Sequence, residues 1–177
     1  SMVKGNPLKL MLQFALPLLI GNLLQQTYNI IDAAIVGQIL GAKALASVGA
    51  SSSVQFLVLG FCMGSCTGFG VPVAKYFGAD DLEKMRNYIF NGAVLVAAIA
   101  VVVTGTCSIL CQQILHLLSV PEDIFDGAYA YLIIIFLGIP FTLMYNYLSG
   151  ILRSVGDSRT PFMFLAFSAC LNIFLDL

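Results

Sequence analysis

Long apolar stretches separated by short polar connections make up nearly the whole sequence. The apolar stretches cover residues 8–39, 44–77, 87–118, 124–153 and 161–177. At about 1.5 Å of rise per residue, each of the first four is long enough to cross a hydrocarbon core roughly 30 Å thick. A helix satisfies its own backbone hydrogen bonds, which lipid cannot do for it. The pattern therefore predicts an all-α integral membrane protein, a multi-span helical bundle with about five transmembrane helices.

Turn-forming and charged residues mark the connections between the apolar stretches. We expect residues 40–43 to form a short connection, and the strongly charged segment 78–86 to form a solvated loop. Pro121 and the two acids that come after it suit the first turn of the fourth helix. Thr160 and Pro161 are predicted to be the N-cap and the first residue of the fifth helix.

Polar side chains interrupt the first apolar stretch in a regular way. At roughly 100° per residue, Asn22, Gln25, Asn29 and Asp32 fall within an arc of about 120°, which is one face of a helix. Polar and ionisable side chains inside membrane helices face a bundle interior or a water-filled cavity, and they mark ion or substrate paths. We therefore expect Asn22, Gln25 and Asn29 to line a substrate cavity and Asp32 to bind a cation or proton. The alternative for the amides is that they only join helices.

The basic residues concentrate in connections that share one side of the membrane if the five spans alternate. Seven of the eight Lys and Arg residues lie there: Lys4, Lys9, Lys75, Lys84, Arg86, Arg153 and Arg159. The opposite connections hold the eighth basic residue, the single histidine and three acids: Lys43, His116, Glu122, Asp123 and Asp126. By the positive-inside rule, the N-terminus is expected in the cytoplasm.

A second intramembrane acid, Asp176, lies in the fifth stretch with Asn172 one helical turn before it. Asp176 is roughly 22 Å from the cytoplasmic start of its helix, and Asp32 is about seven residues from the outer end of the first span. Both acids are therefore expected at comparable depth in the outer half of the membrane. Two carboxylates and an amide suit Na⁺, or the carboxylates would share a proton, and the sequence does not choose between them. The alternative for Asp176 is that it only reaches the outer interface.

The composition agrees with a membrane protein and narrows its chemistry. Of the 177 residues, 59% are hydrophobic and 10% are charged, whereas soluble domains carry about 25% charged residues. The scattered basic residues form no patch, which argues against a nucleic-acid partner. No enzyme, no cofactor and no metal other than a coupling Na⁺ is expected. The cysteines all lie in apolar stretches, so we interpret them as small buried residues rather than metal ligands: Cys62, Cys66, Cys107, Cys111 and Cys170.

An ordered set of short motifs gives the sequence a family resemblance. The earliest part resembles the first-span signature of the multidrug and toxic compound extrusion (MATE) transporters, and it comprises Asp32, Val36-Gly37, Gly41, Leu45-Ala46 and Gly49. Later parts of the same pattern come in order, at Gly78-Ala79-Asp80, Tyr131-Leu132, Gly156-Asp157, Thr160-Pro161, and Asn172 with Asp176. The resemblance covers nearly the whole chain.

The resemblance implies a twelve-helix transporter of two six-helix lobes, which exports cationic amphipathic compounds in exchange for Na⁺ or H⁺. It implies an ion site in the first lobe at Asp32, Asn172 and Asp176, joined by Tyr131 and Asn146 on the fourth span. Residues 1–177 would then be the N-terminal lobe of a prokaryotic inner-membrane protein, truncated before span six and the second lobe, with membrane lipid around it.

A proline in the first span adds a mechanical expectation. Pro17 removes one backbone donor from the helix, so it is the natural place for a bend. It also occupies the place of the span-one proline of MATE transporters. The resemblance implies that the helix bends there as the ion site changes occupancy.

Two alternatives to an exporter stay open on the sequence. A lipid-linked oligosaccharide flippase of a related fold would carry an anionic cargo, which predicts basic residues along the central cavity. The spans here show only acids, which argues against a flippase. The second alternative is a membrane structural subunit that transports nothing.

Overall fold

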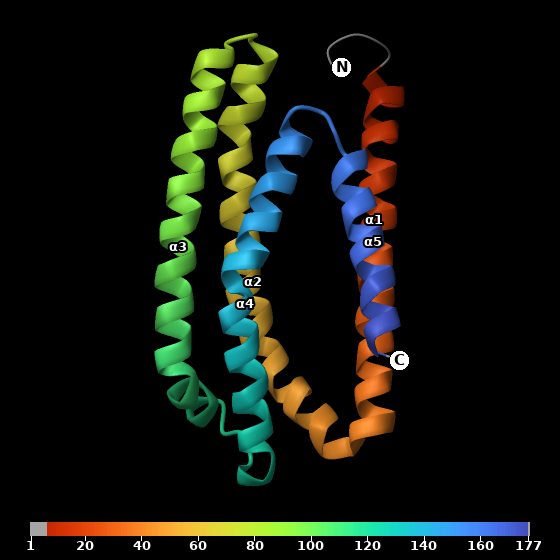
Figure 1. The fold of residues 1–177 in the computed structure, drawn as a ribbon, viewed down its shortest axis with the longest axis vertical. Helices are drawn as coiled ribbons and strands as arrows, with labels where there is room; N and C mark the ends of the chain where they lie inside the picture. Colours follow the sequence, from red (N-terminus) through yellow and green to blue (C-terminus); the bar gives the residue numbers. More distant parts are fainter. Residues whose placement is uncertain (1–6, 177) are drawn as a thin grey trace.

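The computed structural model describes residues 7–176, apart from the side chains at positions 7, 9, 10, 40, 173, 175 and 176. Within this part, helices and short turns make up the whole fold (Figure 1). The elements are α1 (Pro7–Ile35), the π-helical turn η1 (Val36–Leu40), α2 (Gly41–Gly78), α3 (Leu82–Leu117), α4 (Glu122–Ser154) and α5 (Arg159–Asp176). The predicted all-α helical bundle is confirmed.

Among residues 7–176, three helices, α2, α3 and α4, are long and apolar enough to cross a membrane. Large hydrophobic side chains on their outer faces are strongly exposed, including Phe56 at 83%, Ile109 at 80% and Phe141 at 73%. Apolar surface on this scale is unfavourable in water and favourable in lipid. That α1 and α5 also cross the membrane stays a prediction.

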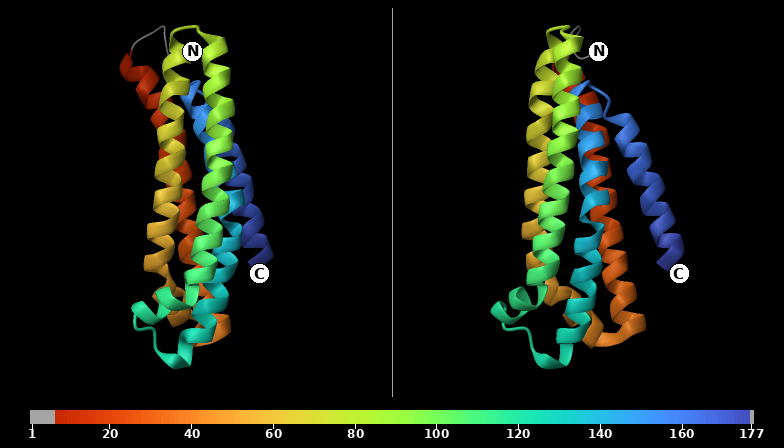
Figure 2. Two further views of the ribbon diagram at one scale, coloured as in Figure 1. Left: turned by 90° about the vertical axis from the view of Figure 1, so that its left-hand side faces the viewer. Right: turned by 60° about the vertical axis from the view of Figure 1, so that its left-hand side comes forward.

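The helices form two groups. Helices α2, α3 and α4 pack together on one side, while α1 and α5 contact each other on the other side (Figures 1 and 2). Helix α1 joins α2 through η1, which turns the chain at the bottom of Figure 1. The two groups therefore face each other across the interior of the molecule.

The described basic residues of the connections gather at one end of the bundle, as predicted, apart from Lys43. We call the end at which α1 and α5 begin the basic end, because it carries the basic residues Lys75, Lys84, Arg86, Arg153 and Arg159. We call the opposite end the acidic end, because its connections carry Glu122, Asp123 and Asp126. That the basic end faces the cytoplasm stays a prediction.

Two segments expected to be loops are partly helical. Residues 40–43 form the end of η1 and the first turn of α2, and Gly41 turns the corner with a φ of 85°, which favours glycine. In the charged segment 78–86, α3 already begins at Leu82. The carboxylate of Asp81 caps this helix by accepting a hydrogen bond of 3.1 Å from the Lys84 backbone N–H. Capping thus extends the helix into charged sequence.

The cap of α5 also differs from the prediction. The carboxylate of Asp157, rather than Thr160, accepts the backbone hydrogen bonds at this helix start, at 3.0 Å from both Arg159 and Thr160. The Thr160 hydroxyl donates to the same carboxylate at 2.6 Å. The Thr160 hydroxyl, followed by the backbone donors, lowers the pKa of Asp157 below its ordinary value. Asp157 acts as the cap because it lies two residues before the start of α5, where its carboxylate reaches the free backbone N–H groups of the first turn.

The core lies between α2, α3 and α4. Phe136, Leu132, Ile139 and Leu143 follow one face of α4 and are fully buried. Three cysteines are buried with them, as predicted, and they are Cys62 and Cys66 on α2 and Cys111 on α3. The prediction is wrong for Cys170, which is exposed because its side of α5 faces away from the bundle, and Cys107 is half-buried.

Candidate functional site

Asp32 of α1 belongs to a polar group that draws on three helices. Asp32 is half-buried and lies in the neighbourhood of Tyr131 of α4. The Tyr131 hydroxyl donates a hydrogen bond of 3.4 Å to Oε1 of Gln55 on α2. We call Asp32, Tyr131 and Gln55 the carboxylate cluster. An acid, a phenol and an amide from separate helices give this cluster oxygen atoms that suit a hard cation or a proton.

Helix α5 runs in the same direction as α1 and contacts it, which sets the level of Asn172. A Cβ placed on Gly21 of α1 would lie 3.2 Å from Cδ2 of Leu165 and 3.5 Å from Cδ2 of Phe162. Because both helices rise about 1.5 Å per residue from the basic end, Asn172 is level with roughly residues 28–31 of α1. Asn172 therefore lies within about one turn of the level of Asp32, and its side chain is half-buried.

The predicted second acid lies at the same level but only its backbone is described. By the same register, the backbone of Asp176 is level with roughly residues 32–35 of α1, and its side chain lies outside the described residues. The axes of α1 and α5 diverge toward the end of α5 (Figure 2, right). Joint binding of one ion by Asp32, Asn172 and Asp176 stays a prediction.

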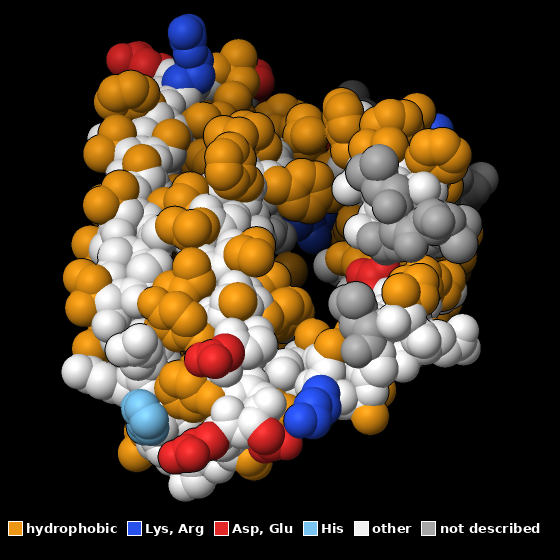
Figure 3. Space-filling model, turned by 60° about the horizontal axis from the view of Figure 1, so that its bottom comes forward, with side chains coloured by type: hydrophobic (Ala, Val, Ile, Leu, Met, Phe, Trp, Pro, Cys, Tyr) orange, Lys and Arg blue, Asp and Glu red, His pale blue; other side chains and the backbone are white. Residues whose placement is uncertain are grey.

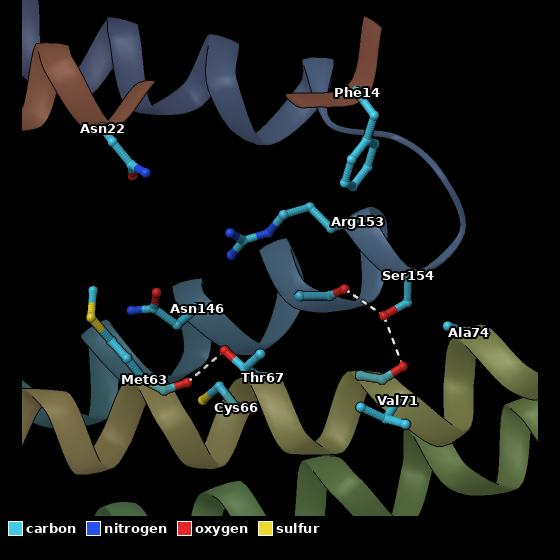
Figure 4. A pocket seen from close by; sticks show the side chains of 12 residues that line it. Phe14, Asn22, Met63, Cys66, Thr67, Val71, Ala74, Asn146, Arg153 and Ser154 are labelled. Carbon is cyan, nitrogen blue, oxygen red and sulfur yellow. Dashed lines mark hydrogen bonds between the residues drawn. The ribbon is translucent and has the colours of Figure 1, made fainter. Parts of the chain in front are cut away.

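A cavity of about 470 Å³ lies between α1, α2 and α4 on the basic-end side of the cluster. Its polar lining includes Asn22 of α1, Thr67 of α2, and Asn146 and Arg153 of α4 (Figure 4). Seen from the acidic end, the molecule is hollowed between its two groups of helices (Figure 3). A basic side chain is visible deep in this hollow, and an acidic one lies on its wall.

One of the three amides predicted to line a cavity does so here. Asn22 lines the cavity, and its side chain points into it (Figure 4). Asn29 is exposed, and its amide donates a hydrogen bond of 3.2 Å to Gln26. Gln25 is half-buried. Neither Gln25 nor Asn29 lines this cavity.

Asn146 and Tyr131, which the resemblance assigned to one network, lie far apart. They are 15 positions apart on the continuous helix α4, or roughly 22 Å along its axis. The amide of Asn146 donates to the Thr142 carbonyl at 2.8 Å and lines the cavity with Asn22. Asn146 therefore belongs to the cavity rather than to the carboxylate cluster, because a continuous stretch of α4 separates the two positions.

Arg153 corrects the expectation that acids alone enter the interior. Arg153 is the last residue of the predicted fourth stretch and was counted with the connection that follows, whereas α4 continues one residue further, to Ser154, and the arginine lies on its last turn. Its Nε donates a hydrogen bond of 3.1 Å to the Ser149 carbonyl. This bond turns the side chain back along the helix and into the cavity (Figure 4). The sequence pattern missed this because a terminal arginine usually reaches toward water.

Gln55 is the cluster member that sequence reasoning missed. It stands in an apolar span rich in small residues, and its single amide was not distinguished from packing residues there. A lone amide within a membrane span was the available signal, because such groups are costly unless they have partners.

The family model for MatE matches residues 17–177, a range that contains the carboxylate cluster and most of the cavity lining. The chain belongs to the MatE family. MatE proteins are integral membrane transporters, so the resemblance inferred from the motifs is confirmed. A curated relative named "Probable multidrug resistance protein YpnP", from Bacillus subtilis (strain 168), is 37% identical over 172 residues. The match covers 97% of this chain and 39% of that relative.

Solved structures of MatE proteins share the fold. A MOP superfamily transporter from Pyrococcus furiosus is similar, with a TM-score of 0.92 and 26% identity over 99% of this chain and 38% of that chain. A MATE structure in the bent conformation has a TM-score of 0.90 and 26% identity, over 99% of this chain and 39% of that chain. The chain thus spans about two fifths of the length of these MatE proteins.

Proposed function

We propose that the whole protein is an ion-coupled antiporter that exchanges Na⁺ or H⁺ for cationic amphipathic drugs or toxins across a prokaryotic cell membrane. The observation that carries this proposal is the carboxylate cluster, in which Asp32 of α1, Tyr131 of α4 and Gln55 of α2 come together inside a helical bundle. An acid in such a place marks an ion path. The multidrug-resistance name of the Bacillus relative supports the export of drugs.

The coupling ion would bind where α1 and α5 carry their acids. Asp32, Asn172 and Asp176 would supply oxygen ligands, and Tyr131 would add its hydroxyl oxygen. Binding of the ion favours one arrangement of the helices and binding of the drug favours another, so each ligand weakens the affinity for the other by linkage. Alternating access requires two repeats that move against each other, so we expect a second lobe of the same polypeptide as partner.

Pro17 gives this switch a place to move. It lies inside the continuous helix α1, between the basic end and Asp32. A bend there would shift one part of α1, and with it the distance between Asp32 and the helices opposite. Solved MATE structures in the bent and in the straight conformation are equally similar to this chain, each with a TM-score of 0.90, which supports a change between two shapes. The positive-inside rule supports a cytoplasmic basic end and N-terminus.

The experiment that tests this function is ion-driven transport of ethidium by the whole protein in proteoliposomes. Na⁺ and pH gradients are imposed separately, and ethidium is the cationic probe. We expect ethidium to be taken up against its own gradient when one of the two ion gradients is imposed. Without any ion gradient we expect no such uptake. Equal uptake by protein-containing and protein-free vesicles under both gradients would refute transport and favour a structural subunit.

Replacing Tyr131 by Phe tests the cluster more finely. The hydroxyl that donates to Gln55 is lost, so we expect the affinity for the coupling ion to fall about threefold, or roughly 0.7 kcal/mol. The variant Gln55→Leu should cost less, because it removes only the partner of that hydroxyl. The double variant should cost little more than Tyr131→Phe alone, because the shared contact is already lost. The measurement is the ion concentration that gives half-maximal flux, and fully additive effects would show that the two residues act separately.

A further inference from the structure

The cavity next to the basic end holds a positive charge that the described acids do not neutralise. Arg153 is half-buried, and its terminal guanidinium nitrogens point into the cavity (Figure 4). Among the side chains that the structure describes, Asp81 and Lys84 form an ion pair within 4 Å, and Arg153 does not form one. A guanidinium that faces the interior of a membrane bundle is costly unless an anion accompanies it.

Asp32 is too far along α1 to neutralise Arg153. The cavity contacts α1 at Phe14 and Asn22. Asp32 is ten positions beyond Asn22, or roughly 15 Å along the helix axis. The interior therefore contains two charged regions of opposite sign, separated along the bundle.

The donors around Arg153 are arranged for an anionic group. The Nε hydrogen bond to Ser149 holds the guanidinium and leaves the terminal nitrogens directed into the cavity. The amides of Asn22 and Asn146 face the same space from opposite helices (Figure 4). A guanidinium matches a carboxylate or phosphate with two parallel hydrogen bonds, and neighbouring amide donors add to this.

Much of the remaining lining is apolar, although Thr67 and Ser154 also belong to it, and this apolar part defines the body of the ligand. Phe14, Met63 and Val71 line the same cavity from α1 and α2. A volume of about 470 Å³ is that of a site for a small amphipathic molecule. A simple organic cation would be repelled by Arg153 at this place.

We propose that this cavity binds amphipathic molecules through an anionic group, a carboxylate or a phosphate, which Arg153 holds with Asn22 and Asn146. The proposal rests on the proposed function only in taking the cavity as part of the transport path. It adds anionic and zwitterionic compounds to the cationic substrates. Binding at Arg153 requires no ion gradient, so an equilibrium measurement tests it separately from coupled transport.

The test is fluorescence titration of the whole protein in detergent with 11-(dansylamino)undecanoic acid and with its methyl ester. We expect the wild type to bind the acid at least roughly tenfold more tightly than the ester, as a charge-assisted pair should. Arg153→Gln should remove this preference and leave ester binding within about twofold. Arg153→Lys should keep part of the preference for the acid, because lysine keeps the positive charge but cannot form the two parallel hydrogen bonds of a guanidinium.

A matched control is Arg159→Gln, which removes an exposed basic residue from the same end but outside the cavity lining. It should leave the preference for the acid unchanged. Competition by phosphatidylglycerol against the dansyl acid distinguishes a lipid headgroup from a transported compound as the natural source of the anion. Equal affinity of the wild type for the acid and the ester would overturn the proposal. It would also be overturned if Arg153→Gln folded normally but bound neither the acid nor the ester.

Discussion

Replacing Asp32 by Asn in the whole protein is expected to reduce ion-coupled efflux to the level of protein-free vesicles. Asparagine has nearly the same shape but carries no charge and binds no proton at neutral pH. A coupling cation would lose a charged ligand in a site shielded from water, where charges interact strongly. The measurement is ethidium transport in proteoliposomes with the Na⁺ or pH gradient that drives the wild type.

The control for Asp32→Asn is Asp126→Asn, which removes an exposed acid of the acidic end, outside the carboxylate cluster. It should leave efflux close to the wild-type value, because the acid is already in contact with solvent. Expression and thermal stability of both variants are measured alongside. Full coupled efflux by Asp32→Asn at normal protein levels would contradict the proposed ion site.

Replacing Phe136 by Ala is expected to destabilise the bundle strongly. The Phe136 ring is 0% exposed at the centre of the core between α2, α3 and α4. Removing it leaves a void whose walls lose their dispersion contacts. We expect the free energy of unfolding to fall by about 2 kcal/mol or more, and less than the same change would cost in water, because the unfolded helix keeps its side chains in lipid.

The matched control lies five residues along the same helix. Phe141 is 73% exposed on the outer face of α4, so Phe141→Ala should change stability by less than about 0.5 kcal/mol. Thermal unfolding in detergent is followed with a thiol-reactive dye, which reports the exposure of Cys62, Cys66 and Cys111. The exposed Cys170 is first replaced by Ser to remove its background. Similar melting temperatures for the two alanine variants would show that α4 does not pack as described.

The sequence by itself determined the class of the protein and the order of its helices. Lipid offers no hydrogen bonds to the backbone, so a long apolar segment in a membrane forms a helix. The short polar segments between these helices then fix the approximate positions of their ends. The half-buried position of Asp32 follows from the same physics, because a carboxylate among apolar residues is too costly to face lipid. The helix ends were less predictable where a side chain such as Asp157 decides the cap from outside the helix.

The tertiary structure decided which polar residues meet. Helical periodicity gives the face of a residue but not the helix it opposes, so Gln55 joined Tyr131 without any sequence pattern that linked them. Asn146 and Tyr131 were separated because a continuous α4 holds them about four turns apart. Arg153 entered the interior through one hydrogen bond to Ser149, a local geometry that composition and spacing do not encode. The sequence thus shows which charged residues lie within the spans, whereas the packing of the helices decides which of these residues share a cavity.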